Sequence, residues 1–483
     1  MKEFTFALEQ HAYLQEKTNG FFLISKTPLR ILRLNRALFL ILKQIQNGDR
    51  LSELIYKSHE ENKDILLKQL LSLTSKGYLK LAEVAEPESY PAVSIIIPVK
   101  DRPEDIVECL QSLSDLNYPE DKMEVIVVDD GSKQSISDIV SSFNAKLIKL
   151  EESQGASVCR NIGAHNAGGD ILAFLDADCI ADKNWLREIV PFIQIEGIGA
   201  VGGLVDSYYH KSQLDRYEEA FSSLSMGKRL IFQGNTESSF YVPSCNLLVT
   251  SAVFRAMGGF KKEMHVGEDV DLCWRIRKNG HILLYVPAGK VAHKHRNKLF
   301  KMLQRRKDYG TSEAPLYYFH RDKKKRFPIS IFAMLSLLAL ITAILLRNPY
   351  IACFIVLFFG IDLYRKSINL KRQNFSFPLL PVIYSVLRSY FAFYYFASFH
   401  FIRYYLILLI GLGFVFHFLW VLCGAALLLT SIIDYRIKKP DLFYPVFFYF
   451  YTLEHLAYQT GVFWGCLKLK HFRAYIPAFS PAY

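Results

Sequence analysis

The stretch Ile171-Leu-Ala-Phe-Leu-Asp176-Ala-Asp178-Cys179 decides the fold class of this 483-residue chain. Its leading apolar residues predict a short buried strand, which carries the carboxylates of Asp176 and Asp178 just beyond its carboxyl end. Two anions this close repel unless a cation or a hydrogen-bonding ligand compensates, and hard carboxylate oxygens suit Mg²⁺ or Mn²⁺ better than Zn²⁺. The alternative is a strand end followed by an Asp-rich turn. The rest of the sequence favours the metal site.

The segments around this stretch alternate between strands and helices. Strands are predicted at residues 93–98, 124–129, 146–150 and 171–176, and helices near residues 103–117, 134–143 and 157–168. This order predicts a parallel, doubly wound α/β sheet, with its ligand crevice outside the carboxyl ends of the strands. Those ends carry polar clusters, namely Lys100-Asp101-Arg102, Asp129-Asp130-Gly-Ser132 and Asp176-Ala-Asp178. No Gly-x-Gly-x-x-Gly loop follows the first strand and no Walker loop is present, which disfavours a dinucleotide-binding or P-loop protein.

Composition separates a globular head from an apolar tail. The hydrophobic content of 51% and the aromatic content of 14% are high for a wholly soluble protein. Apolar and polar runs alternate before about residue 327, whereas long uncharged stretches dominate beyond it. Much of the net charge of +12 lies beside this tail, as in Lys323–Arg326, Arg365-Lys366 and Lys438-Lys439. This pattern predicts cytoplasmic membrane flanks rather than a nucleic-acid groove.

Cysteine usage and the first residues predict a head that stays in a reducing cytoplasm. The eight cysteines are scattered singly, without the close pairs of a zinc ribbon or a disulfide framework. Residues 1–20 carry charge throughout and lack the apolar core of a signal peptide. In the tail, membrane spans or interfacial helices are predicted at residues 329–346, 350–364, 375–401, 404–433 and 442–467, with the number of true spans left open.

Residues 1–86 predict a small separate unit with a winged-helix-like order. A strand is predicted at residues 21–24, helices at residues 29–45, 51–55 and 65–73, and a strand at residues 78–81. The alternative is a small helical cap over the next domain. Residues 86–91 are predicted to form a linker.

Ordered motifs in the head resemble those of family 2 glycosyltransferases with a GT-A fold. The motifs are Val93–Arg102 (VSIIIPVKDR), Glu124–Ser132 (EVIVVDDGS), Gly155–Gly163 (GASVCRNIG), Leu172–Asp178 (LAFLDAD) and Val266–Arg277 (VGEDVDLCWRIR). The resemblance covers roughly residues 93–297. The N-terminal unit, with Thr27-Pro-Leu-Arg-Ile-Leu-Arg-Leu34, resembles the peptide-recognising PqqD-like module. This module, the transferase and a membrane tail in one chain resemble the mycofactocin-system glycosyltransferases.

The resemblance implies a UDP-sugar site and a divalent ion, Mn²⁺ or Mg²⁺. Asp178 would bind the ion together with His293, or with His295 in its place. The ion neutralises charge as UDP departs. The implied nucleotide-sugar-binding residues are Pro98, Lys100, Asp101, Asp130, Arg160 and Asp176, with Asp130 on the uracil.

The resemblance also implies a general base and an acceptor side. Acidic residues at a helix start are ordinarily partners of the helix dipole, but the family's Glu-Asp pair makes Asp269 the general base. The implied acceptor-binding residues are Ser244, Asn246 and Glu268, although a polar turn is the alternative for the first two. The Gln-x-x-Arg-Trp signature of processive synthases is absent, since residues 304–308 read Gln-Arg-Arg-Lys-Asp. Extrusion of a long polysaccharide is therefore not expected.

These inferences define four expected regions and three functional hypotheses. The regions are a PqqD-like module (1–86), a GT-A domain (92–300), a basic juxtamembrane connector (301–327) and membrane helices (328–483). We expect an inverting transferase on the inner or plasma membrane, with a cytoplasmic catalytic domain and no nucleic-acid partner. It would move a hexose, foremost glucose, from a UDP-sugar to a peptide-derived or small-molecule acceptor, building a short β-linked glycan. The alternatives are a lipid-linked or polysaccharide acceptor, and a noncatalytic peptide-binding membrane adaptor.

Overall fold

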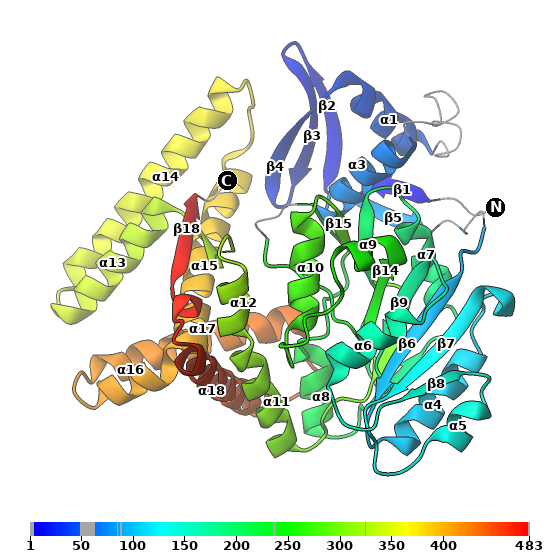
Figure 1. Ribbon diagram of the computed structural model, residues 1–483. Coiled ribbons are helices and arrows are strands. Elements are labelled where there is room, and N and C mark those ends of the chain that lie inside the picture. Colours follow the sequence, from blue (N-terminus) through cyan, green and yellow to red (C-terminus); the bar gives the residue numbers. More distant parts are fainter. Residues whose placement is uncertain are drawn as a thin grey trace. The chain divides into compact units, whose positions relative to one another are not determined.

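The computed structural model describes residues 4–48, 63–84, 86, 89–234, 238–323 and 325–481 (Figure 1). The chain divides into two compact units. The first comprises Met1–Glu9 and Leu40–Met302, and the second comprises Gln10–Phe39 and Leu303–Tyr483. The N-terminal segment therefore contributes to both units.

An eight-stranded sheet forms the centre of the first unit (Figure 1). Its spatial order is β13 (Ile231–Gln233), β15 (Ile282–Tyr285), β11 (Ile198–Gly202), β14 (Asn246–Thr250), β9 (Ile171–Leu175), β6 (Val93–Val99), β7 (Met123–Asp129) and β8 (Lys146–Lys149). The four predicted strands, β6 to β9, are confirmed and run parallel. The prediction of a wholly parallel sheet is wrong, because β14 runs antiparallel to β9 and β11, and β13 runs antiparallel to β15.

The direction of strand β14 determines which residues meet at the carboxyl edge of β9. Asn246, its first residue, lies opposite Leu175, the last residue of β9. The segment that enters β14 therefore meets Asp176 and Asp178 at one edge of the sheet. A parallel β14 would have placed Ser244 at the opposite edge.

Helices cover both faces of this sheet. The α-helices described after β6 in this unit are α4 (Pro103–Ser114), α5 (Ser137–Ser141), α6 (Ala156–His165), α7 (Trp185–Ile193), α8 (Gln213–Phe221), α9 (Ser251–Ala256) and α10 (Glu268–Lys278). Residues of α6, α9 and α10 share one core cluster with Leu247 and Val249 of β14. Trp185 of α7 instead contacts Asn246, which points to the other face because side chains alternate along a strand. The helices predicted near 103–117, 134–143 and 157–168 are confirmed.

Helix α6 packs closely on the sheet at Gly163. A Cβ atom placed there would lie 2.4 Å from Cγ2 of Ile96 in β6. We therefore expect Gly163→Ala to lower the free energy of unfolding by about 1–3 kcal/mol, the usual cost of overpacking. Gly168→Ala is the matched control, because its nearest atom lies at an ordinary 3.5 Å. Urea unfolding of both variants checks this, and equal midpoints would contradict it.

The N-terminal residues form more strands than predicted. β1 (Thr5–Leu8) pairs with β5 (Leu79–Glu83), and β2 (Ala12–Lys17), β3 (Gly20–Lys26) and β4 (Leu29–Leu34) form an antiparallel sheet. The helix predicted over residues 29–45 is wrong in its first part: residues 29–34 pair with β3, and α1 (Arg36–Asn47) begins after Asn35, whose side chain accepts from the Leu38 N–H. Helix α3 (Lys63–Ser75) matches the prediction for 65–73. The helix predicted at 51–55 lies outside the described residues, as does part of the predicted linker.

The second unit joins the β2–β4 sheet to the C-terminal helices. Phe22 and Ile24 of β3 share a core cluster with Phe375 and Val382. The helices are α11 (Leu299–Thr311), α12 (Glu313–Phe319), α13 (Ile331–Leu345), α14 (Cys353–Arg372), α15 (Leu379–Tyr404), α16 (Leu406–Gly413), α17 (Phe418–Lys438) and α18 (Tyr444–Leu469). β17 (Lys325–Ile329) and β18 (Pro477–Pro481) pair in parallel.

Among the described residues, α15 and α17 are long and apolar enough to cross a membrane. The core helix of a soluble protein can meet the same criterion of length and composition. Helix α13, which coincides with the predicted span 329–346, has only 15 residues, fewer than the roughly 20 that a span needs. The two remaining long helices, α14 and α18, do not meet the criterion.

Candidate active site

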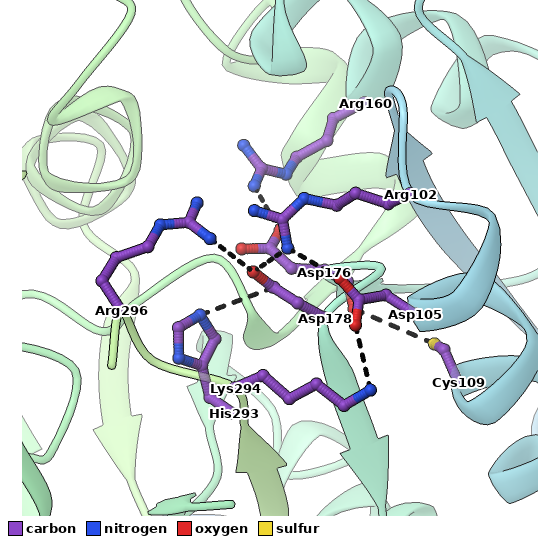
Figure 2. Close-up of polar contacts among 9 residues, drawn as sticks. All are labelled: Arg102, Asp105, Cys109, Arg160, Asp176, Asp178, His293, Lys294 and Arg296. Carbon is purple, nitrogen blue, oxygen red and sulfur yellow. Dashed lines mark hydrogen bonds and ion pairs between the residues drawn. The ribbon is translucent and has the colours of Figure 1, made fainter. Parts of the chain in front are cut away.

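Two arginines organise the carboxylates at the carboxyl edge of the sheet (Figure 2). Arg102 donates from Nη1 to Oδ2 of Asp178 at 2.6 Å. Arg160 is buried in α6, and it donates to Asp176 at 2.6 Å and to Glu268 at 2.9 Å. These ion pairs join strand β9 to the starts of α4 and α10. They hold the predicted residues Asp176, Asp178, Arg160 and Glu268 in one cluster.

Asp178 presents its two carboxylate oxygens to different partners (Figure 2). Oδ2 faces cations, because Arg102 lies at 2.6 Å and Arg296 at 3.8 Å. Oδ1 faces Nε2 of His293, 3.5 Å away. The structure thus brings together the two predicted metal ligands, and the oxygen turned toward His293 is the one that the arginines leave open.

The local strand pairing explains how His293 reaches Asp178. β10 (Cys179–Ala181) pairs antiparallel with β16 (Val291–His293), and β16 also pairs with β12 (Val205–Ser207). In this register Cys179 lies opposite His293, so Asp178, in the turn before β10, lies beside it. A carboxylate oxygen and an imidazole nitrogen are common ligands of divalent ions, and their 3.5 Å spacing fits one shared ion.

His295, the alternative ligand, lies in a different network. Its Nε2 lies 3.1 Å from Oδ1 of Asp215, and its Nδ1 lies 2.9 Å from the hydroxyl oxygen of Ser207. Both ring nitrogens therefore have partners away from Asp178. His293 is the better placed of the two histidines to bind an ion.

The predicted uracil-side residues lie in the loops after β6 and β7. The Asp130 carboxylate accepts hydrogen bonds from the Ser153 hydroxyl and from the backbone N–H groups of Gln154 and Gly155. Asp101 is exposed and accepts from the Lys133 N–H. Asp130 thus shapes the loop before α6 while remaining at the edge of the sheet.

The other two residues predicted to bind the nucleotide, Pro98 and Lys100, differ in exposure. Pro98 is buried within β6, whereas Lys100 is exposed just after the strand. Lys100 can therefore reach a nucleotide at the carboxyl edge of the sheet, whereas Pro98 can act only through the shape of the strand.

Asp269 is a partly buried carboxyl group at the start of α10. Its Oδ2 accepts from the Ser244 N–H at 3.3 Å and its Oδ1 accepts from the Val270 N–H at 2.8 Å. Burial, and secondarily the negative charge of Glu268, raises the pKa of Asp269 to about 7. A carboxyl group with a pKa near neutrality can accept a proton at physiological pH. Ser244, whose N–H donates to Asp269, and Glu268, the preceding residue of α10, lie beside it.

Asn246 does not fit its predicted acceptor role. Its Nδ2 donates to the carbonyls of Leu204 and Gly289, and its Oδ1 accepts from the Trp185 indole. The residue is fully buried, and these bonds use both of its amide protons. Its side chain therefore holds β14 to its surroundings, which corrects the sequence-based assignment.

Arg102, Lys294 and Arg296 at the site were not predicted from the sequence. Lys294 donates to Asp105 at 2.9 Å and pairs with Glu108 at 2.9 Å, which ties β16 to α4. Arg102 could have been predicted, because it belongs to the polar cluster Lys100-Asp101-Arg102 at the end of a predicted strand. Lys294 and Arg296 flank the two histidines, and nothing in the sequence shows which of these side chains turn toward Asp178.

The mixed sheet and the carboxylates at its edge define a GT-A type glycosyltransferase fold. A family model described as glycosyl transferase family 2 matches residues 94–254. The chain is also 30% identical to glycosyltransferase AglE of Haloferax volcanii over 257 residues, which cover 51% of this chain and 82% of that protein. The chain belongs to glycosyl transferase family 2, as its motifs predicted.

Particular relatives are named by two further comparisons. The chain is 34% identical to the pre-mycofactocin glycosyltransferase of Mycobacterium tuberculosis over 266 residues, which cover 53% of this chain. The match spans 55% of that relative's length, so it covers about half of each protein. Among solved structures, the mannosyltransferase PcManGT of Pyrobaculum calidifontis in complex with GDP-Man and Mn²⁺ is 16% identical, with a TM-score of 0.41, and covers 68% of this chain and 92% of that chain.

Proposed function

We propose that this protein is a metal-dependent, inverting glycosyltransferase that moves a hexose, foremost glucose, from a UDP-sugar to a hydroxyl group of a peptide-derived acceptor. One observation carries the proposal: a candidate ion site at Asp178, lined by Arg102, shares the sheet edge with a partly buried carboxyl group, Asp269, whose pKa is raised to about 7. The ion site would stabilise the departing diphosphate, and the Asp269 carboxylate would take the proton of the attacking hydroxyl. Both groups are what a single displacement requires.

The donor would bind at the carboxylates and arginines around Asp178. Asp178 and His293 would hold Mn²⁺ or Mg²⁺, which when bound neutralises charge that develops on the leaving diphosphate. Arg102 and Arg296 add positive charge on the same side of Asp178. Asp130, Lys100 and Asp101 would bind the nucleotide, with Asp176 oriented by Arg160.

The acceptor side uses Asp269. In its ionised form Asp269 takes the proton of the acceptor hydroxyl as the oxygen attacks the anomeric carbon opposite the UDP. Ser244 and Glu268 lie beside this base, where they can contact the acceptor. One displacement converts an α-linked donor to a β-linked product.

The acceptor class rests on similarity and on the N-terminal residues. The relative that matches at 34% identity is named a pre-mycofactocin glycosyltransferase, which supports a peptide-derived redox-cofactor precursor as acceptor. Residues 1–86 would supply the PqqD-like peptide-recognition module. Deletion of residues 1–86 should then reduce transfer to the peptide acceptor, and undiminished transfer would remove this role.

Membrane association is part of the proposal. Helices α15 and α17 have the length and composition of spans. Basic side chains follow the apolar part of α14 and end α17, at Lys371, Arg372 and Lys438. Such flanks favour the cytoplasmic side of a bilayer. We infer that the catalytic unit faces the cytoplasm of the inner or plasma membrane.

A lipid-linked or polysaccharide acceptor is the second candidate. It is supported by large exposed apolar side chains on the C-terminal helices, which could present a lipid acceptor; examples are Leu380, Phe391, Val421 and Trp464. The experiment that separates the candidates supplies purified protein with a panel of UDP-sugars and with extracts, and identifies products by mass spectrometry. A sugar-bearing peptide product supports the first candidate, whereas a glycolipid supports the second. Absence of UDP release under all conditions favours a noncatalytic adaptor.

The rate of transfer is expected to rise with pH through about 7, because Asp269 accepts a proton only when ionised and its pKa lies at about 7. Glu268→Gln removes the neighbouring negative charge, so this variant should shift the acidic limb of the kcat/KM profile to lower pH. Profiles of the two proteins check this. An acidic limb at the same pH in both would contradict the assignment of Asp269 as the titrating base.

A further inference from the structure

The residue that follows Asp178 is a cysteine whose side chain faces the candidate ion site. Cys179 and His293 lie directly opposite one another in the antiparallel pair of β10 and β16. Opposed residues in such a pair place their side chains on the same face of the sheet. The sulfur of Cys179, an oxygen of Asp178 and a ring nitrogen of His293 all lie within 4.8 Å of one another.

This spacing suits an ion with tetrahedral geometry. With metal–ligand bonds of about 2.0–2.1 Å, oxygen and nitrogen ligands of Zn²⁺ lie about 3.4 Å apart. Oδ1 of Asp178 and Nε2 of His293 lie 3.5 Å apart. The Cys179 sulfur supplies a third ligand position within the same spacing, and this residue is fully buried.

The chemistry of the three donors differs from that of a purely hard ion site. Mg²⁺ and Mn²⁺ prefer oxygen ligands, whereas a thiolate selects Zn²⁺, and Zn²⁺ binds mixed N, O and S sites more tightly than Mn²⁺ does. We propose that Asp178, Cys179 and His293 bind Zn²⁺ at this site, and that Zn²⁺ thereby displaces the hard ion and inhibits sugar transfer. The inhibition rests on the proposed function, whereas the binding itself does not.

Zinc binding at Cys179 exchanges a proton for the ion. The S–H bond of Cys179 breaks, a sulfur–zinc bond forms and the proton passes to solvent, with no change of oxidation state. The Cys245 thiol contacts Cys179, so the pair must be kept reduced with a phosphine rather than a thiol reductant, which would itself bind zinc.

Cobalt serves as the spectroscopic probe of the binding. Of the eight cysteines, all of which lie in the described part of the chain, Cys353 alone is exposed, so the full-length Cys353→Ser protein removes the thiol that would bind metal nonspecifically. Titration of this protein with Co²⁺ should produce a thiolate-to-cobalt charge-transfer band that Zn²⁺ abolishes. Cys179→Ala should remove the band. The matched control is Cys109→Ala, a buried thiol near the site whose sulfur contacts the Asp176 carbonyl, and it should keep the band.

Activity provides the second measurement. With Mn²⁺ present, Cys179→Ala should require at least about tenfold more Zn²⁺ for half-inhibition, since even outer partners of metal ligands change affinity 10–100-fold. Cys179→Ser is the second variant, because it keeps the size of the side chain and is less disruptive to folding. It should also raise the Zn²⁺ concentration needed for half-inhibition. A cobalt band that persists in both variants, or no band in the parent protein, would overturn the proposal. If the protein transfers no sugar with any ion, the proposed function fails, and the cobalt band still decides the binding site.

Discussion

Replacement of Asp269 by Asn is expected to lower kcat/KM for sugar transfer by about 10²–10⁴-fold, the range that a positioned general base contributes. Asparagine keeps the size of the side chain and one oxygen that can accept from the Ser244 or Val270 N–H groups. It cannot accept the acceptor's proton. Binding of UDP should be unchanged, because we propose that the donor binds at Asp130 and beside Arg102 and Arg296.

Kinetics with saturating donor and isothermal titration with UDP check this prediction. Glu263→Gln is the control, since it makes the same carboxylate-to-amide change on an exposed residue of the preceding loop and should leave the rate unchanged. Equal losses of transfer and UDP affinity in Asp269→Asn would point to a damaged fold. A rate within a factor of a few of the parent would exclude Asp269 as the base.

Replacement of Asp178 by Asn is expected to weaken activation by Mn²⁺ at least about 100-fold, since even outer-shell partners of metal ligands change affinity by 10–100-fold. The change removes the charge that faces His293 on one side and Arg102 on the other. The apparent activation constant for Mn²⁺, measured from initial rates, should rise accordingly.

Asp105→Asn is the matched control for the ion site. Asp105 pairs with the same guanidinium, Arg102, at 3.1 Å, and lies outside the proposed ligand set. It should leave the Mn²⁺ activation constant nearly unchanged. If both variants shift this constant equally, the effect comes from Arg102 and the assignment of Asp178 as a metal ligand is wrong.

Strands β6, β7 and β9 of the parallel half could be predicted from the sequence because each is a largely buried apolar run that ends beside polar residues. Strand β14 has the same apolar character, and its direction depends on a pairing with β9 that no local pattern records. Similarly, the pattern of Leu29–Leu34, with arginines at positions 30 and 33 between apolar residues, fits either a helix face or a strand. Pairing with β3 made it a strand.

The candidate site could be predicted in part for a related reason. Carboxylates at the ends of parallel strands converge by topology, so Asp130, Asp176 and Asp178 could be expected at one edge. Burial could not be predicted in the same way: Asn246 lies in a motif that resembles an acceptor loop, yet its side chain is fully bonded inside the fold. The thiol of Cys179 was likewise unpredicted, because its facing partner His293 is distant in the sequence.

The measurement that tests the central claim most directly is the anomeric configuration of the product. Proton NMR of the sugar transferred from an α-linked UDP-hexose reads this configuration from the coupling constant of the anomeric proton. A single displacement assisted by Asp269 predicts a β-linked product whose formation requires a divalent ion. An α-linked product, or transfer that is undiminished after removal of divalent ions, would contradict the account.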